Sequence, residues 1–143
     1  MTVTAAIPEG FALHTRKSGL TEPWEPIYSR RTEEALILGI VAGPQHCNAR
    51  GFVHGGLISA LADNALGHSC GMRHQAIGGL VTLSLTVDFV RAAQQGQWLE
   101  FVTTYVKAGG SVDTAQGRVT ADGEVCALIS ANFKILKAPA KAA

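Results

Sequence analysis

A single carboxylate set among apolar and small residues is the group in this sequence best suited to do chemistry. Asp63 ends the run Gly55-Gly56-Leu57-Ile58-Ser59-Ala60-Leu61-Ala62-Asp63, which follows the loop Asn48 to His54. A carboxylate is costly to bury unless it is paired or used. The unpaired N–H groups at the start of a helix favour a developing negative charge. Together these features predict a site that cleaves a carbonyl compound.

The element that must position Asp63 is a helix, which we expect from Gly55 to about Met72. At about 100° per residue, its apolar side chains fall on one face: Leu57, Ile58, Leu61 and Ala65. Asp63 falls on the opposite face among small residues, namely Gly56, Ser59, Ala60 and Gly67. Small side chains on this face would let another backbone approach closely.

The rest of the chain reads mainly as strands. From Leu80 apolar and polar residues alternate up to Phe89, as in a strand with one buried face. We expect further strands over 33–42, 98–107, 111–121 and 124–134, with hairpin turns at Gly109-Gly110 and Asp122-Gly123. Residues 8–18 are expected to form a short helix, 20–31 a loop or irregular edge segment and 44–53 a loop. This order predicts an α+β fold, an antiparallel sheet packed on one central helix.

The predicted helix separates two groups that a carbonyl-cleaving site would need together. Gly55 and Asp63 are eight residues apart, which is about 12 Å along a helix. A catalytic carboxylate and an oxyanion donor must both come within about 3 Å of their targets. Two such helices packed antiparallel through their small faces would bring Asp63 of one chain to the Gly55 end of the other. We therefore expect a homodimer with two shared sites and an inactive monomer.

The pattern Asn48-x5-His54-Gly55-Gly56-x6-Asp63 resembles the signature of the hotdog-fold acyl-CoA thioesterases, specifically the phenylacetate-pathway (PaaI-type) subfamily. The resemblance covers roughly residues 10–136 and implies a hotdog fold, in which an antiparallel sheet wraps one long helix. It implies hydrolysis of an acyl-CoA to a free acid and CoA. A thioester has a good leaving group and little resonance stabilisation, so one carboxylate and oxyanion donors could suffice without a metal or other cofactor.

The resemblance also implies a role for each motif residue. Asp63 would act as general base or nucleophile, and the Gly55 N–H would polarise the thioester carbonyl. Asn48 would orient the lytic water or the carbonyl, and His54 would order the loop near the thiolate leaving group. Thr82, seven residues before Phe89, would help to hold the water, with Ser84 as its competitor.

Each of these residues also has a purely structural interpretation. Asp63 could be satisfied by a backbone N–H or by Asn64, and His54 could only cap the helix. Asn48 is a common turn residue, and the glycine pair could serve close helix packing alone. We count Gly56 among the substrate-binding residues. Basic residues that could contact the CoA phosphates are, in order of preference, Arg91 and Lys107, followed by Arg50 and Arg73.

Composition limits the remaining possibilities. The 143 residues suit one domain, 1–143, with a frayed tail over about 137–143. A net charge of +1 gives no reason to expect nucleic acid or a membrane as partner. The start of the chain lacks the features of a secretory signal, and three irregularly spaced cysteines fit a reducing compartment, so we expect a cytoplasmic protein.

Several alternatives stay open at this stage. The histidines and cysteines match no zinc spacing, so no metal site is expected. The protein could instead be a hotdog-fold hydratase or dehydratase of enoyl thioesters, or a non-catalytic acyl-CoA binding module. The acyl group, and the choice between a dimer and a tetramer built as a dimer of dimers, are left undecided.

Overall fold

The computed structural model describes residues 5–139; residues 140–143 of the expected frayed tail lie outside this range. It contains one long helix, α1 (Gly55–Gly71), and two short 3-10 helices, η1 (Glu22–Trp24) and η2 (Pro44–His46). The seven strands are β1 (Ala12–Leu13), β2 (Tyr28–Arg31), β3 (Leu36–Val41), β4 (Gly79–Phe89), β5 (Trp98–Lys107), β6 (Val112–Ala121) and β7 (Glu124–Leu136). No helix in this part of the chain is long and apolar enough to cross a membrane.

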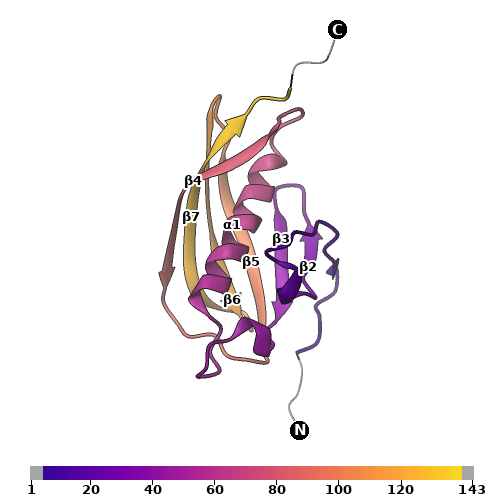
Figure 1. Cartoon of the computed structure of the whole chain (residues 1–143), viewed down its shortest axis with the longest axis vertical. Helices are drawn as coiled ribbons and strands as arrows, with labels where there is room; N and C mark the ends of the chain where they lie inside the picture. The colour runs from indigo at the N-terminus through magenta and orange to yellow at the C-terminus, as the bar shows by residue number, and fades with distance from the viewer. Residues whose placement is uncertain (1–4, 140–143) are drawn as a thin grey trace.

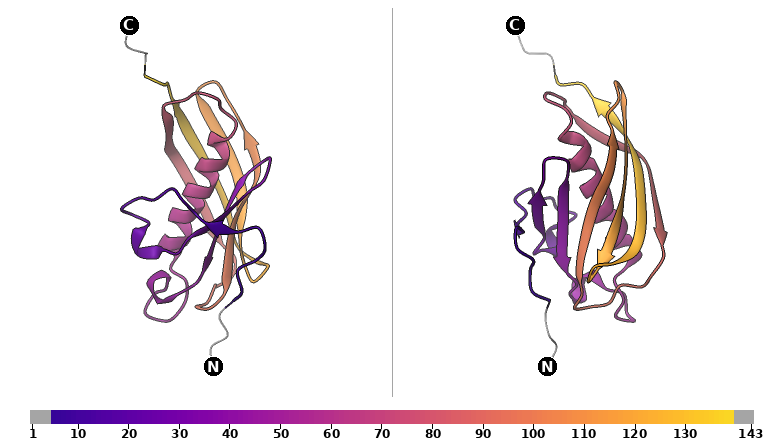
Figure 2. Two further views of the ribbon diagram at one scale, coloured as in Figure 1. Left: turned by 90° about the vertical axis from the view of Figure 1, so that its right-hand side faces the viewer. Right: turned by 180° about the vertical axis from the view of Figure 1, so that it is seen from behind.

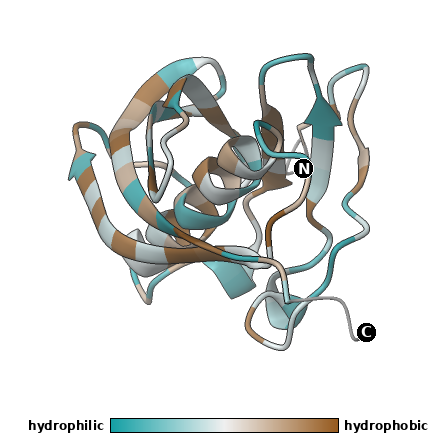
Figure 3. Cartoon of the chain, turned by 90° about the horizontal axis from the view of Figure 1, so that it is seen from above, coloured by the Kyte–Doolittle hydropathy of each residue, from teal (hydrophilic) through white to brown (hydrophobic). Residues whose placement is uncertain are grey.

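All seven strands form one antiparallel sheet in the order β1-β2-β3-β5-β6-β7-β4. The helix lies across one face of the sheet (Figures 1 and 2). Viewed along the long axis of the molecule, the sheet curves around the helix (Figure 3). The expected α+β architecture is confirmed, and the expected helix and the strands from β3 to β7 are present within a few residues of their expected ends.

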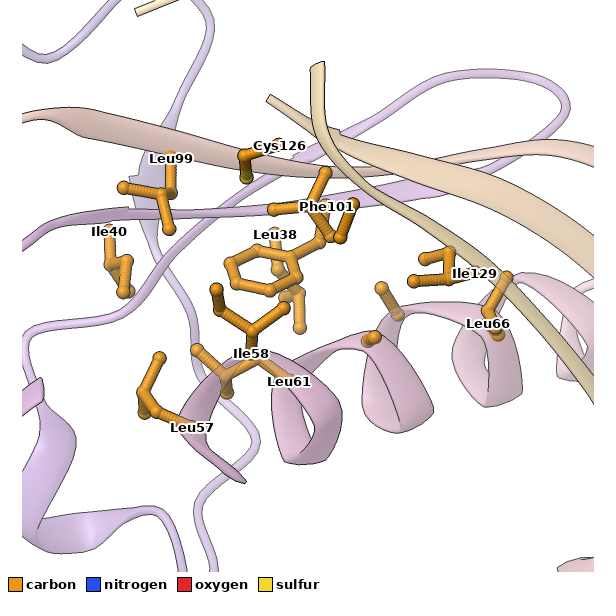
Figure 4. Packing of buried hydrophobic residues seen from close by; sticks show 14 of the residues in the cluster. Leu38, Ile40, Leu57, Ile58, Leu61, Leu66, Leu99, Phe101, Cys126 and Ile129 are labelled. Atoms are coloured by element: carbon orange, nitrogen blue, oxygen red, sulfur yellow. The ribbon is translucent and has the colours of Figure 1, made fainter. Parts of the chain in front are cut away.

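The apolar face of α1 packs against the sheet. Leu57, Ile58, Leu61 and Ala65 are each at most 4% exposed, as the helical period predicts. Figure 4 shows three of them facing side chains of the central strands, namely Leu38, Ile40, Leu99 and Phe101. The opposite face of the helix is therefore the face available for a site.

The expected helix over 8–18 is wrong. Gly10 has φ +91, a left-handed conformation that interrupts a helix, and Ala12 and Leu13 pair with β2 instead. The Phe11 ring packs edge-on against the Trp98 ring, with 5.1 Å between centroids. The segment expected as a loop or irregular edge over 20–31 contains η1 and β2. This amino-terminal hairpin adds two strands to the sheet through contacts distant in sequence.

β4 is an edge strand, and its burial differs from the expected pattern. The alternation of apolar residues predicts a strand correctly, but Val81, Leu83 and Phe89 are 48%, 56% and 54% exposed. The strand pairs with β7 on one side and has no strand neighbour on the other within residues 5–139. The helix of the same chain therefore covers only some of the apolar side chains of β4.

Candidate active site

Asp63 and Thr82 meet where α1 passes β4. Thr82 Oγ1 donates a hydrogen bond to Asp63 Oδ1 across 2.6 Å, and the Asp63 residue is half-buried. Ser84 accepts instead from Asn132 Nδ2 on the neighbouring strand β7, at 2.9 Å. Of the two hydroxyl residues considered from the sequence, Thr82 is thus the one that reaches the carboxylate.

The Asp63 carboxylate is not satisfied internally. Neither a backbone N–H nor Asn64 bonds it, and Thr82 is its one hydrogen-bond partner in the described part of the chain. The two residues line a chamber of about 730 Å³ beside α1. Asp113, by contrast, is fully buried, pairs with His74 at 2.6 Å and accepts from the Gly109 N–H at 3.0 Å. Only Asp63 is a carboxylate with a free oxygen beside open space at this helix.

The start of α1 leaves one N–H group unpaired. His54 is the N-cap residue, and its Nδ1 accepts from the Gly56 N–H at 2.8 Å. The Gly55 N–H has no acceptor among residues 5–139. A Cβ built on Gly55 would lie 3.1 Å from Phe89 Cζ, so this ring closes over the helix start. Gly55 and Phe89 line a second, smaller hollow of about 450 Å³.

The loop before the helix is shaped by Asn48. Its Oδ1 accepts from the backbone N–H groups of Arg50 and Phe52, at 2.9 and 3.2 Å. This is the turn role that Asn often plays. Its Nδ2 group makes no hydrogen bond within the described residues, and the residue is exposed, so a donor is left for another partner.

The four basic residues considered for CoA binding are divided between the two ends of α1. Arg91 lines the hollow beside Gly55 and forms an exposed ion pair with Glu124 at 3.3 Å. The Arg50 guanidinium lies 5.6 Å from the Phe52 ring centroid, at the same end. Arg73 follows the carboxyl end of the helix, where it donates to the Glu34 carbonyl at 3.1 Å. Lys107 also lies toward that end, opposite Thr114 at the start of β6.

One chain does not bring Asp63 and Gly55 together. Asp63 lines the large chamber and Gly55 lines the smaller hollow, and the two cavities share no lining residue. Both groups lie on one straight helix, so their separation of about 12 Å follows from the helical rise. The structure therefore has the separation between Gly55 and Asp63 that the sequence predicted.

The chamber is also lined by residues that sequence reasoning missed. The amino-terminal segment contributes His14, Arg16, Lys17 and Arg31, and α1 contributes His68. The His14 and His68 rings meet edge to face with 5.5 Å between centroids. Burial, with the positive charges of His14 and Arg16, lowers the pKa of His68 to about 4. No local pattern in the sequence indicates that residues 14–31 lie over the helix.

Thiol and metal chemistry have little support in the described residues. Burial raises the pKa of the Cys47 thiol, and burial together with the charge of Asp113 raises that of Cys70 to about 12. A thiol with a raised pKa is a poor nucleophile near neutral pH. Nor do three or more His, Cys, Asp or Glu side chains of residues 5–139 converge as metal ligands would.

An antiparallel sheet wrapped around one long helix, with the motif residues Asn48 to Asp63 on the helix and the loop before it, is the hotdog fold. The family model of the thioesterase superfamily matches residues 50–127, and the chain belongs to this superfamily. The resemblance noted from the motif is confirmed at this level.

Individual relatives agree with this assignment. The chain is 32% identical over 130 residues to PA0474 of Pseudomonas aeruginosa, which is named provisionally as an esterase, with 90% of this chain and 97% of the relative covered. A Bacillus halodurans protein solved with CoA, BH2602, is 28% identical with a TM-score of 0.68, over 78% of this chain and 74% of that one. The Escherichia coli PaaI protein has the same fold, with a TM-score of 0.68 at 22% identity over 78% and 80% of the two chains.

Proposed function

We propose that this protein hydrolyses acyl-CoA thioesters in sites shared by two subunits, as a thioesterase of the PaaI type. The observation that carries the proposal is the Asp63 carboxylate, held by Thr82 and free on its second oxygen beside a chamber of about 730 Å³. Membership of the thioesterase superfamily and a CoA-bound relative support a thioester of CoA as the substrate class.

The proposed reaction is a simple acyl transfer to water. Asp63 either takes a proton from a water molecule that attacks the thioester carbonyl, or attacks the carbonyl itself to form an anhydride that water then cleaves. The negative charge on the carbonyl oxygen is stabilised by the Gly55 N–H of the partner subunit. The C–S bond breaks, the thiolate leaves and takes up a proton, and the products are a carboxylic acid and CoA.

The edge strand supports the sharing of sites. Thr82 lies beside Asp63 and Phe89 lies beside Gly55, so β4 runs alongside α1 in the opposite direction. Consider two β4 strands paired antiparallel about a two-fold axis near Leu85 and Thr86, midway between Thr82 and Phe89. Thr82 would then lie opposite Phe89 of the partner subunit, and Asp63 would approach Gly55 of the partner subunit. The same pairing would cover the exposed apolar edge of β4.

The other motif residues receive supporting roles in this proposal. Asn48 shapes the loop through its oxygen and offers its Nδ2 group to the water or the carbonyl. His54 fixes the helix start and leaves the Gly55 N–H free by binding that of Gly56. Arg91 and Arg50, which lie at the Gly55 end, are better placed for the CoA phosphates than Lys107 and Arg73. A dimer of dimers stays a prediction.

The proposal is tested by incubating the purified protein with a panel of short, medium and aromatic acyl-CoAs and following release of free thiol. Hydrolysis releases CoA from at least one substrate. Loss of the enoyl absorbance of an enoyl-CoA without thiol release would indicate a hydratase instead. Saturable binding of acyl-CoA with no reaction would indicate a binding module. Either of the latter results would contradict the proposed function.

A further inference from the structure

The chamber beside Asp63 extends well beyond the carboxylate. It continues along α1 past Asn64 to His68, five residues further on, which is about 7.5 Å along the helix axis. Apolar side chains also line the chamber, among them Ile27, Leu38, Leu61 and Phe133. These apolar walls suit a methylene chain. The far end of the chamber has a different chemical character.

The far end of the chamber is basic. Three cations line it, Arg16, Lys17 and Arg31, whereas Asp63 is the one carboxylate among the described lining residues. Lys17 is paired with Glu25. Neither Arg16 nor Arg31 has an ion pair or a side-chain hydrogen bond within residues 5–139. Two exposed guanidinium groups thus border the chamber, and neither is paired with a carboxylate of the described residues.

Two histidines lie at the same end of the chamber. His14 and His68 pack edge to face, and His14 Nδ1 lies 3.1 Å from Ser29 Oγ. Burial is the main cause of the lowered pKa of His68, and the charges of His14 and Arg16 lower it further. The neutral His68 ring keeps one N–H donor and makes no hydrogen bond in the described part of the chain, so it can serve an anionic acceptor.

We propose that the preferred substrates carry a second carboxylate at the far end of the acyl group, so that they are CoA monothioesters of dicarboxylic acids. Arg16 and Arg31 pair with this distal carboxylate, and His68 donates to it. The acyl chain between the two ends lies against the apolar walls of the chamber. The distal group is unchanged in the reaction, in which water cleaves only the C–S bond. This assignment rests on the function proposed above.

The CoA phosphates are a second source of negative charge that the same arginines could bind. Adipoyl-CoA and hexanoyl-CoA separate the two possibilities, because they have the same number of acyl carbons and the same CoA but end in a carboxylate or a methyl group. A role toward the phosphates would affect both substrates equally, whereas a role toward the acyl end would affect adipoyl-CoA alone.

The test measures kcat/KM for both substrates with the wild type and with Arg16→Gln and Arg31→Gln. Arg30→Gln is the matched control, because Arg30 neighbours Arg31 on β2 but lies over the Phe11 ring, 5.2 Å from its centroid, and does not line the chamber. We expect the wild type to prefer adipoyl-CoA at least about tenfold. Each chamber variant should lose about tenfold on adipoyl-CoA and nothing on hexanoyl-CoA, and Arg30→Gln should match the wild type.

Three results would overturn the assignment. Equal turnover of the two substrates by the wild type, or a preference for hexanoyl-CoA, would overturn it while leaving the thioesterase function intact. Equal losses on both substrates in the arginine variants would assign these cations to the CoA phosphates instead. Absence of hydrolysis with both substrates and with the wider acyl-CoA panel would overturn the proposed function, and this assignment with it.

Discussion

The Thr82 hydroxyl and the Asp63 carboxylate form a 2.6 Å hydrogen bond that joins β4 to the middle of α1. The bond fixes one carboxylate oxygen and leaves the other without a partner in the described residues. A carboxylate oriented in this way can take a proton from a water or attack a carbonyl without first breaking an internal contact.

Replacing Asp63 tests the carboxylate directly. Asp63→Asn keeps the shape of the side chain and a hydrogen-bond acceptor for Thr82 but removes the base and nucleophile. We expect turnover to fall by about 10²–10⁴ or more, with an unfolding temperature close to that of the wild type. Thiol release from the best acyl-CoA and thermal unfolding are measured on the same preparation. Near wild-type turnover would remove Asp63 from the mechanism.

The hydroxyl on β4 is tested by a pair of variants. Thr82→Ala removes the hydrogen bond to Asp63, and we expect kcat to fall about tenfold. Ser84→Ala is the control, because Ser84 bonds Asn132 instead, and it should leave kcat unchanged. Thr82→Ser should restore most of the lost rate. If Ser84→Ala lowered kcat more than Thr82→Ala, the assignment of the hydroxyl would be wrong.

Asn48 separates a turn role from a catalytic role. Asn48→Asp keeps the oxygen that accepts from the Arg50 and Phe52 N–H groups but has no amide to donate. If the amide acts on water or the carbonyl, this variant should unfold at the wild-type temperature and lose about 10²-fold in kcat. Asn48→Ala should lose both stability and rate. Full activity of Asn48→Asp would show that Asn48 shapes the turn and that its amide takes no part in catalysis.

Much of this molecule could be predicted from sequence because its signals are local. The helical period from Leu57 to Ala65 identified α1 and its buried face, and the distance from Gly55 to Asp63 follows from helix geometry alone. The hydroxyl partner of Asp63 could not be chosen, because Thr82 and Ser84 differ only in register. A bulge in β4 between these two residues sets that register, and the sequence around it carries no clear mark of it.

The amino-terminal part shows where local signals fail. Pro8 and Gly19 favour a short helix over residues 8–18, but pairing of Ala12 and Leu13 with β2 and packing of Phe11 on Trp98 decide their structure. These contacts link residues far apart in sequence, so no short stretch of the sequence indicates them. The same segment brings His14 and Arg16 over α1, and the basic end of the chamber was therefore missed.

Mixing two inactive variants tests whether sites are shared. Gly55→Pro removes the free N–H at the first helical position, where proline is tolerated, and His54 already has the extended backbone that precedes proline. Gly55→Ala is its control, since it adds the contact with Phe89 but keeps the N–H. We expect Gly55→Pro to lose about 10²–10³ in kcat and Gly55→Ala to lose less.

Subunits of Asp63→Asn and Gly55→Pro are then exchanged in mild denaturant. If Asp63 of one chain works with Gly55 of the other, each mixed dimer regains one intact site. Activity should return to about a quarter of the wild type, because half of the dimers are mixed and one of their two sites is intact. A mixture no more active than its components would indicate that each site belongs to one chain.

His68 gives the protein a predictable loss of stability in acid. Its pKa is about 4 in the folded chain against 6.5 for a free histidine, so the unfolded chain binds its proton first as the pH falls. The stability that the neutral ring provides is complete above about pH 6.5 and declines toward pH 4. The unfolding temperature of His68→Gln should therefore change less between pH 7.5 and pH 5 than that of the wild type. Identical pH profiles would contradict the buried neutral state.

The exposed edge of β4 has a consequence for how the protein reaches its working form. Val81, Leu83 and Phe89 lie uncovered along a strand whose outer backbone groups have no strand partner in the described chain. In the proposed dimer a second copy covers that edge, so we expect a newly folded subunit to be vulnerable to aggregation until it associates. Recovery of activity after dilution from denaturant should speed up as subunit concentration rises, until precipitation through the same edge overtakes productive association.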